Sequence, residues 1–323
     1  MNLDRLTLQE RVLAGAVLKR VGNATVNYAL AANGDRIYND APSDATVGTL
    51  VGQFQSDPKQ ALGYMRQNLL SIGQDKNLTP AERRDRLGRY FDAYSALTIR
   101  LDHAAFAEND NGNVHQGIPD YIPDGFIDMG GEPSVTPSLR HGREQIKVDK
   151  AAVYSRYRDT LLEILGTDYP DTSDDRIKQR ITRHLMKAVY YQLPYDHSPH
   201  DSESESEGVV NLHEMTEGVC RHQALTYQVL AQACGLTSHL VKCHMDGGRH
   251  ATNATRINHQ WYFIDVTNPD YSTTADGARH WQPAAHKISG APKAGERYKL
   301  TNPHSKITHT YTIRNDMYWR MAS

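Results

Sequence analysis

The chain of 323 residues carries 36 Lys and Arg against 38 Asp and Glu, and 39% of its residues are hydrophobic. This length can bury a substantial core and corresponds to one or two domains. The nearly balanced charge gives no sign of a nucleic-acid or anionic-membrane partner. No apolar run approaches the roughly 20 residues of a membrane span, and the opening "MNLDRLTLQERVLAGAVLKR" is typical of a helix rather than a secretion signal. We therefore expect no membrane span and a cytoplasmic location.

The first part of the chain, residues 1–107, is predicted to be mostly helical. In "LTPAERRDRLGRYFDAYSALTIRL", Thr79 and Glu82 form the sequence pattern of a capping box. An apolar stripe follows at helical spacing, and it indicates core packing. Its members are Leu87, Tyr90, Phe91, Tyr94 and Leu97.

Residues 108–145 are rich in Gly, Pro, Asp and Asn, a composition typical of a long loop or linker. Beyond this loop, 146–323 is predicted to form an α+β domain, because helical patterns come first and strand patterns follow. The tract 201–208, "DSESESEG", is acidic and lacks large apolar residues, so a solvated loop is expected there. The predicted helices cover 150–166, 173–193 and the stretch after Cys220, and the predicted strands cover 251–257, 260–266, 297–301 and 309–314.

Cys220 stands in "EGVCRHQALTYQVLAQACGL", where Thr216 or Glu217 is expected to cap a helix that Gly235 ends. Cys220 would then occupy the first turn, where free backbone N–H groups and the helix dipole favour a thiolate. The same N–H groups could stabilise an oxyanion. Cys234 lies in the last turn, where the dipole disfavours an anion, so a buried core position is expected for it. Three cysteines are too few for a disulfide framework, which favours a reducing compartment.

His250 is the best-placed base for this cysteine. Asn258 and His259 separate two strand patterns and are predicted to form a two-residue hairpin turn. In that register residue 252 faces Asp265, and His250 lies two residues further along, on the same face of the sheet. Such diagonal neighbours are about 7–8 Å apart at the backbone, within reach of an imidazole–carboxylate hydrogen bond. A shift of one residue would place His250 and Asp265 on opposite faces.

These motifs resemble the transglutaminase-like branch of the papain-like cysteine enzymes. The resemblance rests on Gly-Val-Cys before a helix (218–220), His-Ala at a strand start (250–251) and Trp-Tyr-x-x-Asp (261–265), with "LPYD" at 193–196 upstream. It covers about 195–270, and nothing in 1–145 takes part. Family strands often carry an aromatic residue where this chain has Thr252.

The resemblance implies a papain-like core, in which a helix carrying the cysteine packs on an antiparallel sheet. It also implies acyl transfer through a Cys220–His250–Asp265 triad and a thioester, without a cofactor or metal. The substrate would be a protein or peptide with a Gln or Asn side-chain amide or a backbone amide. Water or an amine would accept the acyl group. Asn211 and His213 are candidates for the side chain that completes the oxyanion hole.

Two other readings remain open at this point. One is a catalytically inactive domain of the same fold that serves as a protein-interaction module. The other is a metal site, although no ligand pair has a spacing such as Cys-x-x-Cys. Its ligands would come from Cys220, His239, Cys243, His244 and His250. The role of 1–145, the role of the acidic loop and the oligomeric state do not follow from the sequence.

Overall fold

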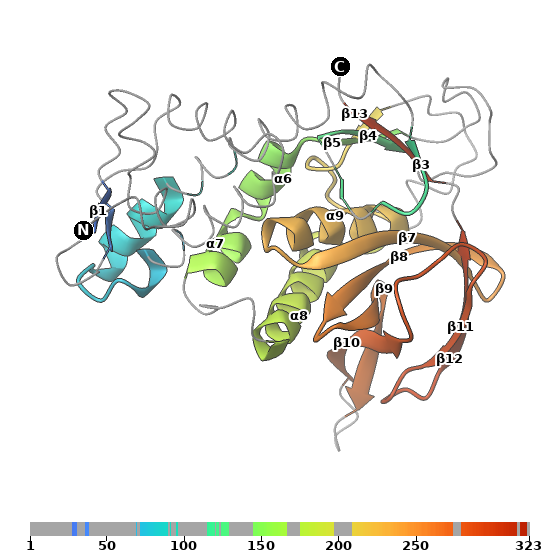
Figure 1. Cartoon of the computed structure of the whole chain (residues 1–323). Coiled ribbons are helices and arrows are strands. Elements are labelled where there is room, and N and C mark those ends of the chain that lie inside the picture. The colour runs from blue at the N-terminus through green and yellow to red at the C-terminus, as the bar shows by residue number, and fades with distance from the viewer. Residues whose placement is uncertain are drawn as a thin grey trace, which may run out of the picture. The chain divides into compact units, whose positions relative to one another are not determined.

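The computed structural model shows an α+β protein with an antiparallel six-stranded sheet, a five-stranded sheet and several helices (Figure 1). It describes residues 28–30, 36–38, 69, 72–89, 91, 95, 115–119, 121–122, 124–128, 145–166, 175–196, 209–273, 279–314 and 317–321. The α+β class expected from the sequence is confirmed. The chain divides into two compact units, Met1–Asn111 with Tyr157–Asp171 and Gly112–Arg156 with Thr172–Ser323. In this division residues 157–171 group with the N-terminal residues.

The first unit contains the predicted capping box. Thr79 N–H donates to Glu82 Oε2 at 2.9 Å and Glu82 N–H donates to Thr79 Oγ1 at 3.3 Å, and the chain is helical over 80–89. Leu87 and Phe91 of the apolar stripe are buried as expected, while Tyr90, Tyr94 and Leu97 lie outside the described residues.

The first unit also contains two short strands, β1 (Tyr28–Leu30) and β2 (Arg36–Tyr38), and helix α7 (Arg158–Gly166). The strands pair antiparallel within a stretch predicted to be mostly helical. Their local sequences explain the difference, because short runs with Tyr and Ile flank an Asn-Gly dipeptide at 33–34, a strong hairpin signal.

The second unit is built around the six-stranded sheet, in the order β10-β9-β8-β7-β12-β11. Its strands are β7 (Thr237–Met245), β8 (Gly248–Ile257), β9 (Gln260–Thr273), β10 (Arg279–Ile288), β11 (Arg297–Thr301) and β12 (Thr308–Arg314). The four predicted strands correspond to β8, β9, β11 and β12. Strand β7 lies between β8 and β12 and is buried on both faces over much of its length, so its sequence lacks clean alternation.

The hairpin of β8 and β9 has the predicted register. Ile257 pairs with Gln260 and Asn253 pairs with Ile264. Asn258 and His259 have φ values of 59° and 57°, which are the left-handed conformations of a type I′ turn. Its right-handed twist matches that of the flanking strands. The side-chain parity on which the choice of His250 depends is therefore confirmed.

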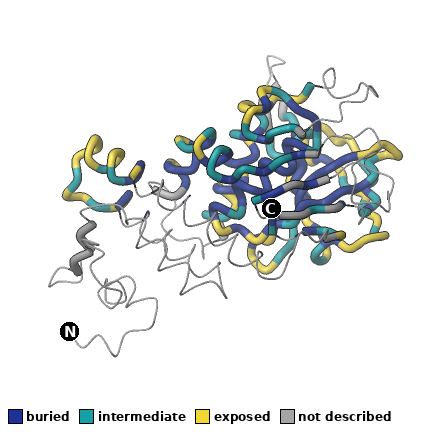
Figure 2. The backbone as a smooth tube through the Cα atoms, turned by 90° about the horizontal axis from the view of Figure 1, so that it is seen from above, coloured by how far each residue is buried: buried dark blue, intermediate teal, exposed yellow. Residues whose placement is uncertain are grey.

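Helix α9 (Cys220–Ala233) packs on β7, β8 and β9, and helix α8 (Asp175–Gln192) packs on α9. α9 is buried along most of its length. Figure 2 colours the described residues by burial, with the buried ones in dark blue. Buried residues on the sheet face that carries Phe263 form an apolar core. They are Val241, Cys243, Ala254, Phe263, Ile288, Tyr311 and Ile313.

A five-stranded sheet lies in the same unit, in the order β3-β13-β4-β5-β6. Its strands are β3 (His115–Gln116), β4 (Gly125–Asp128), β5 (Gln145–Val148), β6 (Val209–Asn211) and β13 (Tyr318–Met321). Strands β3 and β4 fall within 108–145, so 115–116 and 125–128 are strands in a stretch where the sequence predicts a loop or linker. Ile122 and Ile127 are buried there, an apolar contribution that the surrounding Gly, Pro and Asp residues obscured.

Helix α6 (Lys150–Arg156) follows β5 directly and is separate from α7, where the sequence predicted one helix over 150–166. None of the helices in the described part of the chain combines the length and apolar character that crossing a bilayer requires.

Candidate active site

Cys220 is the first residue of helix α9, and Val219 occupies the N-cap position with an extended backbone. The predicted caps, Thr216 and Glu217, lie too early in the chain, and the capping expectation is wrong. The His222 ring replaces them, because its Nδ1 accepts the Val219 N–H at 3.1 Å. The N–H of Cys220 belongs to the first helical turn and has no intrahelical acceptor. The predicted placement of Cys220 in the first turn is confirmed.

The segment before Cys220 is held by backbone bonds to the residues that follow α8. Gly218 N–H donates to Pro194 O at 3.0 Å, and Asp196 N–H donates to Gly218 O at 3.1 Å. Tyr195 and Gly218 form a parallel bridge. The "LPYD" motif therefore lies directly beside the Gly-Val-Cys motif, although more than 20 residues separate them in the sequence.

Arg156, at the end of α6, braces the same segment from another side. Its guanidinium donates to the carbonyl oxygens of His213 (3.2 Å), Met215 and Gln192 (2.6 Å). One side chain thus joins the loop before Cys220 to the last residue of α8. The planar, multidentate guanidinium is suited to several acceptors at once.

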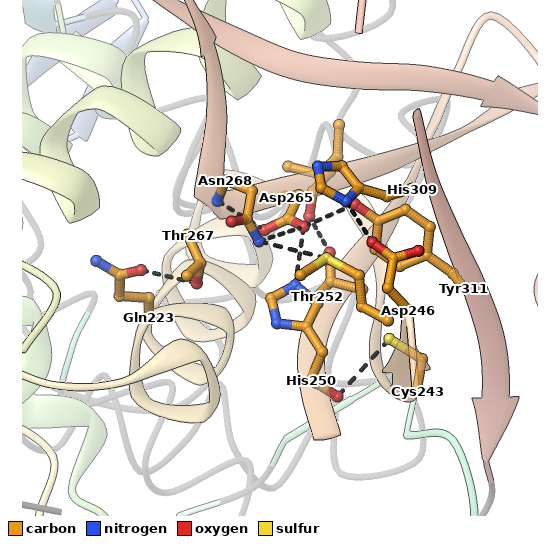
Figure 3. A network of polar contacts seen from close by, with 12 residues as sticks. Gln223, Cys243, Asp246, His250, Thr252, Asp265, Thr267, Asn268, His309 and Tyr311 are labelled. Atoms are coloured by element: carbon orange, nitrogen blue, oxygen red, sulfur yellow. Dashed lines mark hydrogen bonds and ion pairs between the residues drawn. The ribbon is translucent and has the colours of Figure 1, made fainter. Parts of the chain in front are cut away.

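His250 and Asp265 meet as the hairpin register predicts. His250 Nε2 and Asp265 Oδ2 lie 2.8 Å apart, and both side chains are almost fully buried (Figure 3). Because Nε2 donates to the carboxylate, the other ring nitrogen, Nδ1, is left to face a different partner. The Cys220 thiol is close enough to this imidazole for His250 to lower the pKa of the thiol, against the opposing effect of burial.

Asp265 accepts hydrogen bonds from several further donors. Asn268 donates its backbone N–H to Oδ1 at 3.1 Å and its side-chain amide to Oδ2 at 3.2 Å. The Tyr311 hydroxyl, from β12, also donates to Oδ2 at 3.1 Å (Figure 3). These donors favour the carboxylate, and together with His250 they hold the pKa of Asp265 below its usual range despite the opposing effect of burial.

The environment favours a charged thiolate–imidazolium pair. Burial opposes the charge on His250, but Asp265 and the Cys220 thiol outweigh it and raise the pKa of His250 to about 10. Burial likewise opposes ionisation of Cys220. The hydrogen bond from His250, the His250 charge, the Ala251 N–H and Arg221 together lower the pKa of the Cys220 thiol below its ordinary value.

The other two cysteines have different surroundings. Cys234 and Cys243 are fully buried, whereas Cys220 is partly exposed. The predicted core position of Cys234 is confirmed. Burial and the nearby Asp265 carboxylate raise the pKa of the Cys243 thiol well above its ordinary value. Cys220 is therefore the cysteine at which a thiolate is favoured.

Three other histidines near Cys220 in the sequence, His239, His244 and His259, lie outside the His250–Asp265 contact. His259 lies exposed at the hairpin turn, as expected, and His239 packs its ring edge-on against Trp261. His244 lies on β7, paired with Thr312. In the described part of the chain no group of three His, Cys, Asp or Glu residues is arranged to hold a metal ion.

The two candidates for the oxyanion-hole side chain, Asn211 and His213, have their described side-chain contacts with Glu214 and not with Cys220. The Asn211 amide donates to Glu214 Oε2 at 2.8 Å, and His213 lies 3.6 Å from Glu214. Thr252, which replaces the aromatic residue of the family pattern, is buried and donates to Ile264 O at 2.5 Å. It therefore belongs to the interior of the sheet rather than to a surface that a substrate could reach.

Tyr311 and Asn268 are site residues that the sequence reasoning missed. Asn268 lies three residues after Asp265, a spacing at which an Asp side chain can accept a backbone N–H as it does at a helix N-cap, so this local contact was within reach of the sequence. Tyr311 is 46 residues from Asp265 and reaches it through the pairing of β12 with β7. No sequence signal near Asp265 indicates that contact.

Compared with known proteins, the chain matches no family model and no curated protein. Its own geometry is therefore the basis on which a function can be argued.

Proposed function

We propose that the chain is a thiol acyl-transfer enzyme with a transglutaminase-like, papain-like core, in which Cys220, His250 and Asp265 form a catalytic triad. The observation that carries the proposal is the 2.8 Å bond between His250 Nε2 and Asp265 Oδ2, together with Cys220 in the first turn of α9, where the imidazole lowers the pKa of the thiol. A nucleophile, a base that contacts it and a third group that orients the base are the elements of such a site.

The reaction begins from the thiolate–imidazolium pair. Cys220 Sγ attacks the amide carbonyl carbon, a C–S bond forms, and the carbonyl oxygen takes up the negative charge. In this proposal the N–H of Cys220, in the first turn of α9, donates to that oxygen. The tetrahedral intermediate then collapses, the C–N bond breaks, and His250 transfers its Nδ1 proton to the leaving amine. A thioester on Cys220 and a neutral His250 remain.

The second half of the reaction returns the enzyme to its starting state. Neutral His250 takes a proton from water or from an amine as that acceptor attacks the thioester carbonyl. The C–S bond breaks, the acyl group leaves as an acid or a new amide, and the thiolate–imidazolium pair is restored. Asp265 stays ionised throughout, keeps the imidazole oriented and stabilises its positive charge.

The substrate class in this proposal is a protein or peptide that offers a Gln or Asn side-chain amide or a backbone amide. Hydrolysis needs only water at the thioester, whereas transamidation needs an amine acceptor. Incubation with a peptide library and an amine donor, followed by mass spectrometry, separates the outcomes. A gain of about 1 Da marks deamidation, a donor adduct marks transamidation, and shortened peptides mark proteolysis.

The thiolate can be tested without a substrate. Iodoacetamide should alkylate Cys220 at pH values well below 8.5, the ordinary pKa of a free cysteine. Cys234 and Cys243 are internal controls, and Cys220→Ala should abolish the low-pH labelling. Equal reactivity of the three cysteines in the folded protein would remove the main support for an enzyme. A stable partner complex that Cys220→Ser leaves unchanged would favour an interaction module instead.

A further inference from the structure

His222 is a buried histidine two residues after Cys220 that takes no part in the proposed triad. Its side chain is fully buried, and its Nδ1 accepts the Val219 N–H at 3.1 Å. A backbone N–H can donate only to an unprotonated nitrogen, so Nδ1 carries no proton and the neutral ring holds its proton at Nε2. Val219 is also buried, and its N–H would be costly to leave without an acceptor.

The ring is fixed in this position by close packing against Gly218. A Cβ atom added at Gly218 would lie 2.9 Å from His222 Cβ and 3.0 Å from His222 Nδ1. Contacts this short do not occur between well-packed atoms, so only glycine leaves room for the ring. The glycine of the Gly-Val-Cys motif is thus matched to the histidine four residues later.

Two further bonds close the same turn. Val219 O accepts the N–H of His222 at 3.0 Å and the N–H of Gln223 at 3.2 Å. Backbone and side chain of His222 therefore hold both polar groups of Val219, the residue immediately before Cys220. This corresponds to half of a capping box, with histidine at the N3 position that Glu or Gln usually occupies.

We propose that His222 is a positioning residue for Cys220: its Nδ1 bond to Val219 and its packing on Gly218 fix the first turn of α9, and with it the direction of the Cys220 thiol and N–H. The inference rests on the proposed function, because it concerns the thiol that acts as nucleophile. It adds a role that is distinct from the triad, since the contacts that carry it are with Val219 and Gly218.

The test compares two replacements of His222 in the full-length chain. His222→Gln keeps an acceptor that can reach the N-cap N–H from N3, whereas His222→Leu removes it. The rate of Cys220 alkylation by iodoacetamide is measured from pH 5 to 9. We expect His222→Leu to lower the rate at pH 6 by about tenfold and to move the pH midpoint upward, because the thiolate loses its alignment with the helix terminus and the imidazolium. His222→Gln should stay within about threefold of the wild type.

His239→Leu is the control, because it removes a partly buried histidine of the same unit. His239 lies on β7, outside the first turn of α9. The substitution should leave the alkylation profile unchanged. Circular dichroism establishes that each variant is folded. If His222→Leu does not fold, Gly218→Ala provides the second route, because its methyl group displaces the ring while Nδ1 remains chemically intact. It should raise the midpoint in the same direction.

A folded His222→Leu or Gly218→Ala protein with the wild-type pH profile would overturn the role of His222. An altered profile in His222→Gln as large as that in His222→Leu would also overturn it, because rescue by an acceptor would be absent. Failure of the proposed function has a different signature, namely a wild-type Cys220 that is no more reactive at pH 6 than Cys234 and Cys243.

Discussion

Asp265 and His250 are not opposite each other in the β8–β9 pair, yet their side chains meet at 2.8 Å. The register that pairs Asn253 with Ile264 places the two residues diagonally on one face of the sheet. Removing the charge of Asp265 tests what the contact does. In Asp265→Asn, we expect the pKa of His250 to fall and the alkylation of Cys220 at pH 7 to slow by roughly 10²-fold or more, because the imidazolium loses its counter-ion.

Asp246→Asn is the matched control for that experiment. Asp246 also accepts from a histidine, His309, at 2.7 Å, but this pair is more exposed and joins the turn before β8 to β12. Its loss should leave the alkylation rate within about twofold, because an exposed pair contributes little. Similar losses in the two variants would contradict a specific role of Asp265.

The His250–Asp265 pair predicts how the stability of the folded protein depends on pH once the thiol is removed by Cys220→Ser. Asp265 raises the pKa of His250 in the folded protein above the value of about 6.5 expected for the unfolded chain. The resulting stability is fully present below pH 6.5 and is lost as pH rises through the folded pKa. Urea unfolding of Cys220→Ser at several pH values should show this decline. In Cys220→Ser/Asp265→Asn the decline should disappear, and its persistence would assign it to other groups.

Tyr311→Phe removes one donor from Asp265 and keeps the aromatic ring. Tyr311 is buried and packs against Phe263 with ring centroids 4.8 Å apart. We expect the free energy of unfolding to fall by about 1–2 kcal/mol. Alkylation of Cys220 should slow by less than it does in Asp265→Asn, because Asn268 still holds the carboxylate.

Tyr298→Phe is its control, since Tyr298 contacts the same Phe263 ring at 5.9 Å but donates its hydroxyl to Glu296. Because Glu296 lies near the surface, this change should alter the unfolding free energy by less than about 0.5 kcal/mol. Equal effects of the two substitutions on Cys220 reactivity would show that the Tyr311–Asp265 bond has no special part in the site.

Arg156→Lys tests the hydrogen bonds by which the Arg156 guanidinium holds the segment before Cys220. A single ammonium group cannot reach the three carbonyl oxygens that the guanidinium contacts, so we expect the unfolding free energy to fall by about 1–3 kcal/mol. Arg256→Lys, at an exposed position beside the hairpin turn, should change it by less than about 0.5 kcal/mol. Thermal or urea unfolding measures both.

Local patterns predicted the elements on which the candidate site is built. The two-residue turn at Asn258 and His259 was enough to predict the β8–β9 register. That register in turn predicts that His250 approaches Asp265. The end of the helix after Cys220 followed from Gly235. Both signals act over a few residues, which is why the sequence alone was sufficient.

Contacts between distant segments could not be predicted in this way. Tyr311 depends on the pairing of β12 with β7, and Arg156 acts across 59 residues to reach Met215. The capping role of His222 was missed for a different reason, because Thr216 and Glu217 are commoner caps than a histidine at N3. The strands β3 and β4 were obscured by the Gly- and Pro-rich residues around them.

The strand order also bears on the sequence of folding events. Helix α9 and strands β7, β8 and β9 follow one another in the chain and are neighbours in space, so Cys220, His250 and Asp265 can come together through short loop closures. Among the strands of the six-stranded sheet, the hairpin of β11 and β12 comes last in the chain, and β12 pairs with β7 on the side away from β8. We therefore expect the proposed triad to be assembled before Tyr311 arrives, so that the β11–β12 hairpin completes the enclosure of a carboxylate already paired with His250.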